Sequence, residues 1–389
     1  MSSPSSVEVT EPPRRFVSGY VDGVRPNHHM NDSKTKFVNP WPSFRSPKFF
    51  PLLFFILKTN FWPPRVPKNI KSLIPKQTPT WGAEPGNEGS AKATWLGHAC
   101  YLVELPTPPG AARGVRIIFD PVFLHRCSPF QWLGPARYTD PPCAIAEVPA
   151  VDAIVLSHNH YDHTDIPTLR SLLTKSSSSP HVFVALNNAT YLSNALRTPL
   201  SRFHELDWWE ERLLRVPLPT NTDGPAVNAE VRLSCTPSQH ISARSAFDRF
   251  HALWGAWVVE DLHSHKNVYF AGDTAYRTVH DGEDEDKVPV CPAFAEVGER
   301  FGGVDIALLP IGAYSPRAVL SAVHSSPGDA VRIFKDVKAK KALAMHWGTW
   351  ILTAEPVLEP PALLRKECEK AALGPDEFLV PALGETVLF

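Results

Sequence analysis

The chain has 389 residues, of which 43% are hydrophobic and 20% are charged, a composition typical of a globular protein with ample core material. Its 39 lysines and arginines nearly balance its 40 aspartates and glutamates, and the formal net charge of −1 argues against a general nucleic-acid-binding protein. The six cysteines are scattered without a Cys-x-x-Cys pair, so we expect reduced thiols in an intracellular protein.

Two N-terminal regions differ in composition from the rest of the chain. Residues 1–36 are rich in Ser, Pro and charged side chains, so we expect a flexible tail or, alternatively, a tail laid over the domain surface, and they lack the apolar core of a secretory signal. Residues 37–90 are expected to form an arm whose Phe-rich run at 49–57 is flanked by Lys and Arg. That run is shorter than the roughly 20 apolar residues of a transmembrane helix, but it suits a peripheral position at a membrane interface. The alternative is that the arm packs against the domain that follows.

Residues 91–389 are predicted to form one α/β catalytic domain. Two apolar runs on either side of Gly97-His98 predict a β-hairpin, and a third run predicts a strand that ends at Asp120. Ser326 is the predicted N-cap of a later helix, because Pro327 follows it at the first helical position. The further predicted strands lie at 152–156, 182–186, 203–206, 229–235, 254–260, 267–272, 304–309, 341–345 and 386–389, and the other predicted helices at 166–175, 189–196 and 360–373.

The strongest chemical signal is the sequence Ser-His-Asn-His-Tyr-Asp-His at residues 157–163, directly after a predicted strand. Three imidazoles and a carboxylate so close together are hard to explain by packing, because each buried imidazole would need its own partner. Nitrogen and oxygen ligands without thiolates suit a catalytic Zn²⁺ or a similar cation. In an extended segment His158 and His160 can face one ion, while Asp162 and His163, further along, can face a second. We therefore predict two metal ions.

Further ligands are expected where other predicted strands end. His240, Asp273 and His346 each follow such a strand, as a site at the open end of a sheet sandwich requires. His98 and Asp120 are expected to support the ligands from behind, with local turn hydrogen bonding as the alternative. The seven predicted metal ligands are His158, His160, Asp162, His163, His240, Asp273 and His346. Two ions at such a site can activate a water and clamp a phosphodiester, although an ester, thioester or lactone fits equally.

This order of His-x-His-x-Asp-His followed by isolated His, Asp and His resembles the signature of the metallo-β-lactamase superfamily. More closely, the chain resembles the N-acyl-phosphatidylethanolamine-hydrolysing phospholipase D family. The segments that carry this resemblance are Phe-Val-Asn-Pro-Trp-Pro at 37–42, Thr-Trp-Leu-Gly-His at 94–98, Phe-Asp-Pro-Val at 119–122, Ser-Pro-Phe-Gln-Trp-Leu-Gly-Pro at 128–135, Glu-Leu-Asp-Trp-Trp-Glu at 205–210, Ala-Gly-Asp-Thr-Ala-Tyr at 271–276, Pro-Ile-Gly-Ala-Tyr at 310–314 and Met-His-Trp-Gly-Thr at 345–349.

The resemblance implies an αβ/βα sandwich of two mixed sheets flanked by helices, with two Zn²⁺ as cofactors. It implies hydrolysis of N-acyl-phosphatidylethanolamine to N-acylethanolamine and phosphatidic acid by a metal-bridging hydroxide. One ion would be held by His158, His160 and His240, the other by Asp162, His163 and His346, with Asp273 between them. The expected catalytic residues are Asp162, Asp273 and His324.

The same resemblance makes Tyr161 and His324 candidate substrate contacts, although packing is an alternative role for Tyr161. It also implies a membrane phospholipid substrate, peripheral membrane contact and a possible homodimer. One departure from the family pattern is Ile-Ser-Ala-Arg at 241–244. The alternative functions are a metal-dependent lactonase or soluble phosphodiesterase of the same fold, and a non-catalytic membrane-binding protein.

Overall fold

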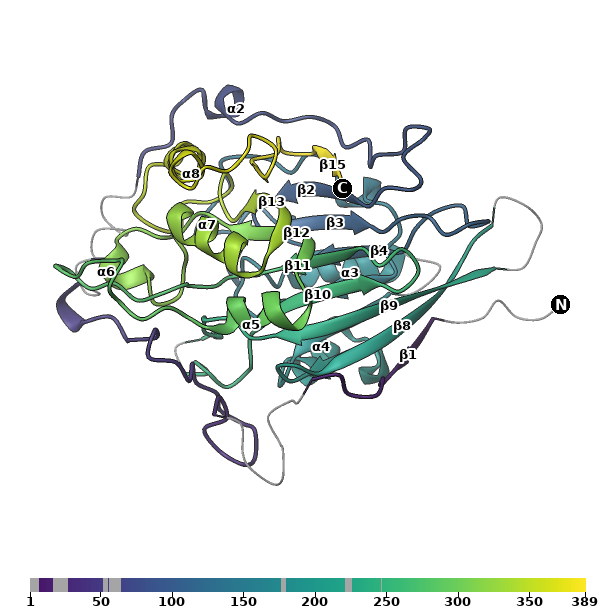
Figure 1. Cartoon of the computed structure of the whole chain (residues 1–389), viewed down its shortest axis with the longest axis horizontal. Coiled ribbons are helices and arrows are strands. Elements are labelled where there is room, and N and C mark those ends of the chain that lie inside the picture. Colours follow the sequence, from purple (N-terminus) through teal and green to yellow (C-terminus); the bar gives the residue numbers. More distant parts are fainter. Residues whose placement is uncertain are drawn as a thin grey trace.

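Two β-sheets lie face to face and carry helices on their outer sides (Figure 1). The computed structural model describes residues 7–16, 27–51, 55, 64–175, 180–220, 226–245 and 247–389. This arrangement confirms the predicted α/β sandwich of two mixed sheets. Every predicted strand and helix of the catalytic domain is present, with ends shifted by a few residues at most.

The first sheet has eight strands and changes from antiparallel to parallel across its width. Its order is β1 (Glu8–Thr10), β8 (Glu211–Leu218), β9 (Val227–Thr236), β10 (Ala256–Asp261), β11 (Asn267–Phe270), β12 (Val304–Pro310), β13 (Ala339–Met345) and β14 (Phe378–Leu379). Pairing is antiparallel from β1 to β11 and parallel from β11 to β14. Carboxyl ends of the parallel strands therefore share one edge of this sheet.

The second sheet has seven strands and the same division into two halves. Its order is β15 (Thr386–Leu388), β2 (Lys92–Gly97), β3 (Cys100–Glu104), β4 (Arg116–Phe119), β5 (Ala153–Val155), β6 (His181–Ala185) and β7 (Phe203–Leu206). Pairing is antiparallel from β15 to β4 and parallel from β4 to β7. The β2–β3 pair is the predicted hairpin.

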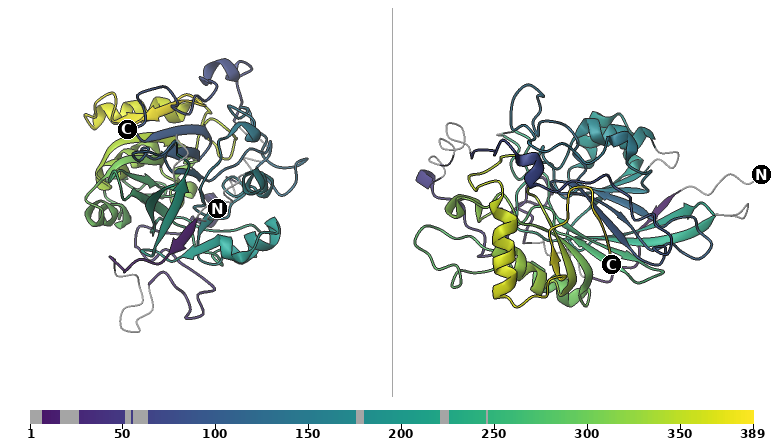
Figure 2. Two further views of the ribbon diagram at one scale, coloured as in Figure 1. Left: turned by 90° about the vertical axis from the view of Figure 1, so that its right-hand side faces the viewer. Right: turned by 90° about the horizontal axis from the view of Figure 1, so that it is seen from above.

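Helices cover the outer faces of both sheets, and the view from above places the C-terminal helix and the α3–α4 pair on opposite sides (Figure 2). On the eight-stranded side lie α5 (Ala293–Arg300), α7 (Pro327–Asp336) and α8 (Glu359–Lys370); on the other side lie α3 (Ile166–Lys175) and α4 (Ala189–Leu196). The short helices are α2 (Ile70–Leu73), α6 (Arg317–Leu320) and 3₁₀ turns at Ile145–Glu147 and Leu200–Arg202. Helix α7 begins as predicted, because Ser326 and Asp329 form a reciprocal capping box.

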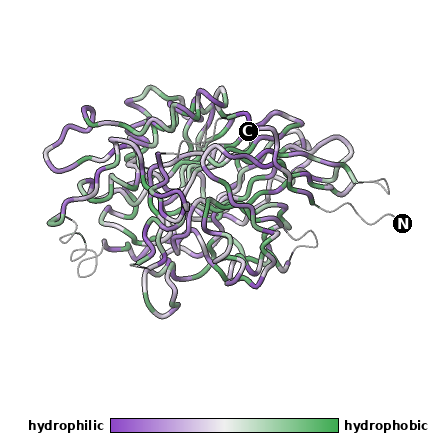
Figure 3. Tube along the Cα trace, turned by 90° about the horizontal axis from the view of Figure 1, so that it is seen from below, coloured by the Kyte–Doolittle hydropathy of each residue, from purple (hydrophilic) through white to green (hydrophobic). Residues whose placement is uncertain are grey.

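The main hydrophobic core fills the space between the sheets and continues beneath α5 and α7, while a smaller one lies beneath α3 and α4. Phe119 and Phe270 join the two sheets, with ring centroids 4.7 Å apart. Hydropathy changes over short distances along the trace (Figure 3), as expected for strands that alternate between two environments. Among the described residues, no helix combines the length and apolar composition that crossing a bilayer requires.

The predicted flexible tail is wrong for part of residues 1–36. Glu8–Thr10 pair with β8 as an edge strand, for which Val9 and Thr10 supply β-branched side chains. His28 and His29 are buried, because the carboxylate of Asp207 offers both imidazoles a partner inside the domain. The polar composition of residues 1–36 gave no indication of the edge strand or of the two buried histidines.

The predicted arm at 37–90 packs against the domain near its two ends. Phe37, Ile70 and Ile74 are buried in the main core. Of the apolar run at 49–57, Phe49 and Phe50 are exposed, and residues 52–54, 56 and 57 lie outside the described part of the chain. The packed alternative therefore holds for the two ends of this arm.

Candidate metal centre

The site forms where the carboxyl ends of parallel strands from the two sheets meet. In the seven-stranded sheet, Asp120 follows β4 and the segment 157–163 follows β5. In the eight-stranded sheet, Asp273 follows β11 and His346 follows β13, with β12 between them. His240 arrives from the loop after β9. The fold thus gathers side chains that are far apart in sequence, as the strand-then-ligand pattern predicted.

The backbone around the site adopts conformations that L-residues rarely occupy. His98, Asp120 and His346 have φ values of 50°, 38° and 62°. Gly272 has φ 57°, and a Cβ there would lie 2.4 Å from the Cβ of Ser157, so only glycine lets this turn approach the 157–163 segment so closely. Left-handed non-glycine residues cost on the order of 1–3 kcal/mol each and cluster at functional sites.

Three imidazole nitrogens converge in the first ligand group. His160 Nδ1 lies 2.8 Å from His158 Nε2 and 3.3 Å from His240 Nε2. Asp273 Oδ2 lies 3.9 Å from the Nε2 of His158 and 3.7 Å from that of His240. These four atoms lie within 4.8 Å of one another, so the group could hold one metal ion.

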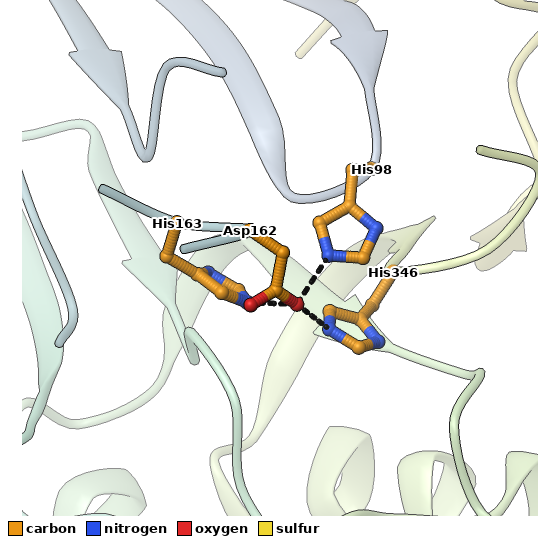
Figure 4. A group of neighbouring side chains, drawn as sticks. All are labelled: His98, Asp162, His163 and His346. Atoms are coloured by element: carbon orange, nitrogen blue, oxygen red, sulfur yellow. Dashed lines mark hydrogen bonds and ion pairs between the residues drawn. The ribbon is translucent and has the colours of Figure 1, made fainter. Parts of the chain in front are cut away.

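The second ligand group surrounds the carboxylate of Asp162 (Figure 4). Its Oδ2 lies 3.4 Å from His163 Nε2 and 3.5 Å from His346 Nε2. Asp273 reaches this group too, with Oδ2 3.1 Å from His163 Nε2 and Oδ1 3.0 Å from His346 Nε2. The Asp273 carboxylate therefore lies within 4 Å of imidazoles from both groups, which is the position that a shared ligand requires.

His98 lies beside the second group, as the sequence led us to expect. Its Nε2 is 3.0 Å from Asp162 Oδ2, and its ring centroid is 4.0 Å from that of His346 (Figure 4). Burial, then the neighbouring His346, lowers the pKa of His98 to about 3, so the ring is neutral. His98 can orient Asp162 by a hydrogen bond, and its nitrogen is also near enough to join the donor set.

Hydrogen bonds behind the ligands fix the outward nitrogen of three imidazoles. Asp120 Oδ2 lies 2.6 Å from His163 Nδ1 and also accepts from Ser157 Oγ. Ser157 Oγ lies 2.9 Å from His158 Nδ1, and the carbonyl of Val323 lies 2.7 Å from His240 Nδ1. A proton on each Nδ1 leaves the Nε2 lone pair free to face the centre. Sequence reasoning identified Asp120 but missed Ser157, whose position before the ligand run was the available signal.

Burial and neighbouring charges shift the pKa values of His158 and His240 in the opposite direction from that of His346. Burial, then nearby imidazoles, holds the pKa of His158 well below its usual value; burial likewise keeps the pKa of His240 well below, although Asp273 opposes it. Burial also opposes charge on His346, but Asp273 and Asp162 raise its pKa to about 9. Burial would raise the pKa of Asp273, yet His163 and His346 hold it well below the usual range. Buried carboxylates of this kind need a neighbouring cation.

Several buried polar atoms that face the centre support a cation there. His163 Nε2, His346 Nε2 and Asp273 Oδ1 make no hydrogen bond of ordinary geometry within the described residues, although both nitrogens lie within 3.1 Å of an Asp273 oxygen. Buried polar atoms are ordinarily hydrogen-bonded, so donor atoms that face one another in this way fit a cation held between them. Imidazole and carboxylate donors without thiolates fit zinc and related divalent ions, and these residues therefore fit the predicted metal centre.

The two predicted substrate contacts occupy different positions. His324 Nδ1 lies 3.9 Å from Asp273 Oδ2, and burial lowers the pKa of this histidine to about 4. Tyr161 instead lies against Arg244, whose guanidinium carbon is 3.9 Å from the ring centroid. Arg244 also donates from Nη1 to the carbonyl of Asn159 at 2.8 Å. The departure noted at 241–244 thus supplies a cation that fastens the ligand segment, a role sequence reasoning missed.

Comparison with known proteins identifies the family. Residues 115–347 match the profile described as the Beta-lactamase superfamily domain. N-acyl-phosphatidylethanolamine-hydrolyzing phospholipase D 1 of Caenorhabditis elegans is 32% identical over 279 residues, which cover 70% of this chain and 68% of that protein. The mitochondrial N-acyl-phosphatidylethanolamine-hydrolyzing phospholipase D of Saccharomyces cerevisiae is 31% identical over 398 aligned positions, covering 91% of this chain and 75% of that protein.

A solved structure gives independent support for the fold. The isothiocyanate hydrolase from Delia radicum gut bacteria aligns with a TM-score of 0.51 and 19% identity, covering 77% of this chain and 99% of that one. The predicted metallo-β-lactamase sandwich is thereby confirmed, and the protein is a metal-dependent hydrolase of this fold. The chain belongs to the N-acyl-phosphatidylethanolamine-hydrolysing phospholipase D family of the beta-lactamase superfamily.

Proposed function

We propose that the protein is a zinc-dependent phospholipase D that hydrolyses N-acyl-phosphatidylethanolamine to N-acylethanolamine and phosphatidic acid. The observation that carries the proposal is the pair of ligand groups that share Asp273, in a chain whose relatives are named for this reaction. Imidazole and carboxylate ligands on two adjoining groups suit hydrolysis of a phosphodiester, whose attacking and departing oxygens both need stabilisation.

The contacts between the candidate ligands support a division into two sets, one for each ion. His158, His160 and His240 would hold one ion, Asp162, His163 and His346 the other, and Asp273 both. Two zinc ions there would supply an activated water near neutral pH and Lewis-acid stabilisation of the phosphodiester oxygens. Asp120 and Ser157 keep the imidazoles in the tautomers that such a site requires.

His324 is the proposed catalytic group that is not a ligand. Its Nδ1 is buried, has no hydrogen-bond partner among the described residues and lies beside Asp273. An imidazole N–H there can donate to a phosphate oxygen as negative charge develops on it. Tyr161 would add a phenolic donor to the substrate, with its ring held in place by Arg244.

Peripheral membrane contact through an aromatic loop tip completes the proposal. Phe130, Trp132 and Leu133 are 51%, 75% and 56% exposed, and the two rings lie 5.5 Å apart. Exposed aromatic side chains grouped in this way suit the headgroup region of a bilayer. The loop is anchored beside the centre, because Trp350 donates to the carbonyl of His125 and contacts the His98 ring.

The test is release of N-acylethanolamine from N-acyl-phosphatidylethanolamine in mixed micelles, with zinc per chain measured on the same preparation. We expect release by the purified protein carrying two zinc ions and none by Asp273→Ala. Asp281→Ala, an exposed carboxylate substitution, serves as the matched control and should behave as the wild type.

Either of two results would contradict the proposal. A wild-type protein with two metals that leaves this lipid intact, yet hydrolyses a lactone or a soluble phosphodiester, would assign the site to another substrate. A protein that binds the lipid but carries no metal would support a non-catalytic membrane-binding role. Vesicle sedimentation with Trp132→Ser tests the membrane contact separately, and unchanged sedimentation would remove that part of the proposal.

A further inference from the structure

Two of the family segments take no direct part in the metal centre, yet the structure brings them together. Residues 37–42 belong to a stretch, 27–45, that we call the N-terminal strap. Residues 205–210 comprise the end of β7 and the turn after it, which carries Asp207 and Trp208. The two segments contact each other through Trp41 and Trp208, and the strap also contacts His240 in the loop after β9.

The decisive contact is between the side chain of Asn39 and the backbone of His240. Asn39 Nδ2 donates to the carbonyl of His240 at 2.8 Å, and the His240 N–H donates to Asn39 Oδ1 at 3.2 Å. Both residues are buried. One planar amide therefore satisfies both backbone groups of a candidate ligand, which would otherwise be buried without a partner.

Only an amide side chain matches this pattern. The backbone of His240 presents a donor and an acceptor, and a carboxamide offers the complementary acceptor and donor on one rigid group. A carboxylate of the same size keeps the acceptor but turns a second oxygen toward the His240 carbonyl. An alanine leaves both backbone groups buried and unpaired.

A second strap residue holds the residue beside the ligand. Ser43 Oγ donates to Gln239 Oε1 at 2.6 Å. Gln239 Nε2 in turn donates to the carbonyl of Ala322, and its carbonyl accepts from Ala275 N–H. The strap thus fixes the Gln239-His240 pair between the loops that carry Asp273 and His324.

The strap is itself fastened to the segment 205–210. The Trp208 ring is stacked between His28 and Trp41, with centroid distances of 4.2 Å and 5.4 Å. His28 Nε2 lies 2.7 Å from Asp207 Oδ1, and His29 Nε2 lies 2.9 Å from Asp207 Oδ2. These contacts hold the strap at His28, His29 and Trp41, and Asn39 lies between these points in the sequence.

We infer that Asn39 is a positioning residue for the site formed by His158, His160 and His240. In this inference the strap serves to hold the Asn39 side chain against the backbone of His240. The inference rests on the proposed assignment of His240 as a ligand. Asn39 acts through another residue: its amide fixes the backbone from which the His240 ring extends, while the Val323 carbonyl fixes the ring. The hydrogen bonds of the Asn39 side chain go to His240 and not to Asp162, His163 or His346, so the ion that these three would hold should be unaffected.

The test measures metal retention rather than activity alone. Full-length wild type, Asn39→Ala and Asn39→Asp would be equilibrated with buffers of graded free zinc, and zinc per chain determined. Loss of an outer partner typically weakens metal affinity about 10–100-fold, so both variants should need that much more free zinc to fill one of the two sites. Their other site should fill at the wild-type concentration. When cobalt replaces zinc, the visible absorption bands of one of the two cobalt ions should differ between each variant and the wild type, and those of the other ion should not.

Asn31→Ala is the matched control, because this asparagine belongs to the same strap but its side chain, within the part of the chain that the structure describes, bonds to Thr35 of the strap itself. It should retain both ions as the wild type does. Equal zinc curves for Asn39→Asp and wild type, or simultaneous loss of both ions, would overturn the inference. If wild type binds two ions but leaves the lipid intact, the proposed substrate fails and the zinc curves still decide the strap. A wild type that binds no ion overturns both.

Discussion

Two buried clusters in this protein are built from the same residue types and do different things. The metal centre and the His28–His29–Asp207 cluster both combine imidazoles with carboxylate; the second is buried throughout, and the first is buried except for His160 and Asp162, which are partly buried. In the second cluster, each oxygen of Asp207 lies within 3 Å of one imidazole nitrogen, at 2.7 and 2.9 Å. That carboxylate is therefore occupied by imidazole partners, and the cluster fastens the strap to the domain.

The difference depends on how many imidazoles face each carboxylate. In both clusters imidazole Nε2 atoms face the carboxylate, and in the metal centre the Nδ1 atoms of His158, His163 and His240 have outward partners. Within the described residues, Asp273 lies within 4 Å of five imidazoles, those of His158, His163, His240, His324 and His346, whereas Asp207 pairs each of its oxygens with one imidazole. Composition in a small volume is therefore insufficient to identify a metal site; the number of imidazoles that share a carboxylate distinguishes the two clusters.

Asp273→Asn should give the largest effect, because it removes the carboxylate that faces both ligand groups. We expect a loss of kcat/KM well beyond the roughly 100-fold upper value for an outer partner, with less zinc per chain. Micellar lipid hydrolysis and metal analysis measure both quantities. The same substitution in the strap cluster, Asp207→Asn, should leave two zinc ions in place; loss of zinc there would erase the distinction between the clusters.

Asp120→Asn should have the next largest effect. The carboxylate accepts from His163 Nδ1 and from both donors of Ser157, so it orients two ligands at once. We expect kcat/KM and zinc affinity to fall about 10–100-fold. A zinc titration at constant pH checks this, and a variant with wild-type zinc affinity would show that Asp120 only closes a turn.

Local patterns predicted the strands and the grouping of the seven candidate ligands, whereas the sandwich was implied by the family resemblance. Apolar runs predicted the strands, and each ligand followed a run, so its place at the sheet edge needed no knowledge of distant contacts. His98 and Asp120 were also foreseen from their positions after strands. Their contacts with Asp162 and His163 are those expected of residues behind a metal site.

The strap could not be predicted, because its packing depends on contacts across nearly 180 residues of sequence. Composition marked residues 1–36 as polar, yet His28 and His29 are buried by one distant carboxylate, that of Asp207. Asn39 lay in a segment noted for family resemblance, but nothing local indicates that its amide meets the backbone of His240. Polar pairs between residues far apart in the sequence leave no periodic pattern from which they could be predicted.

Asp207→Asn should affect stability more than catalysis. The amide keeps one acceptor oxygen and replaces the other with an NH2 donor, so one of the two imidazole N–H groups loses its hydrogen-bond acceptor. The penalty for an unsatisfied buried group is about 1–3 kcal/mol, which we expect as a lower free energy of unfolding in urea. Zinc content and kcat measured on the folded variant should remain close to wild type, and an unchanged unfolding midpoint would show that the cluster does not fasten the strap.

Acidification should give the smallest effect and act through the same cluster. Burial lowers the pKa of His28, more than Asp207 raises it, while His29 and Lys34 lower it further. The unfolded chain therefore takes up this proton first, and the stability present above the usual histidine pKa of about 6.5 declines as pH falls toward the lowered value. The pKa of Asp207 is also held low, so its contribution has the same sign and is lost only in stronger acid. Because one pKa unit corresponds to about 1.4 kcal/mol, the stability that His28 contributes should fall by no more than about that amount between pH 7.5 and 5.5.

Urea unfolding of wild type and His28→Asn at both pH values measures this effect. The comparison separates His28 from the histidines of the metal centre, whose titration is common to the two proteins. If the two proteins lose stability equally on acidification, His28 is not the group that responds, and the strap cluster is held by packing of the Trp208 stack instead.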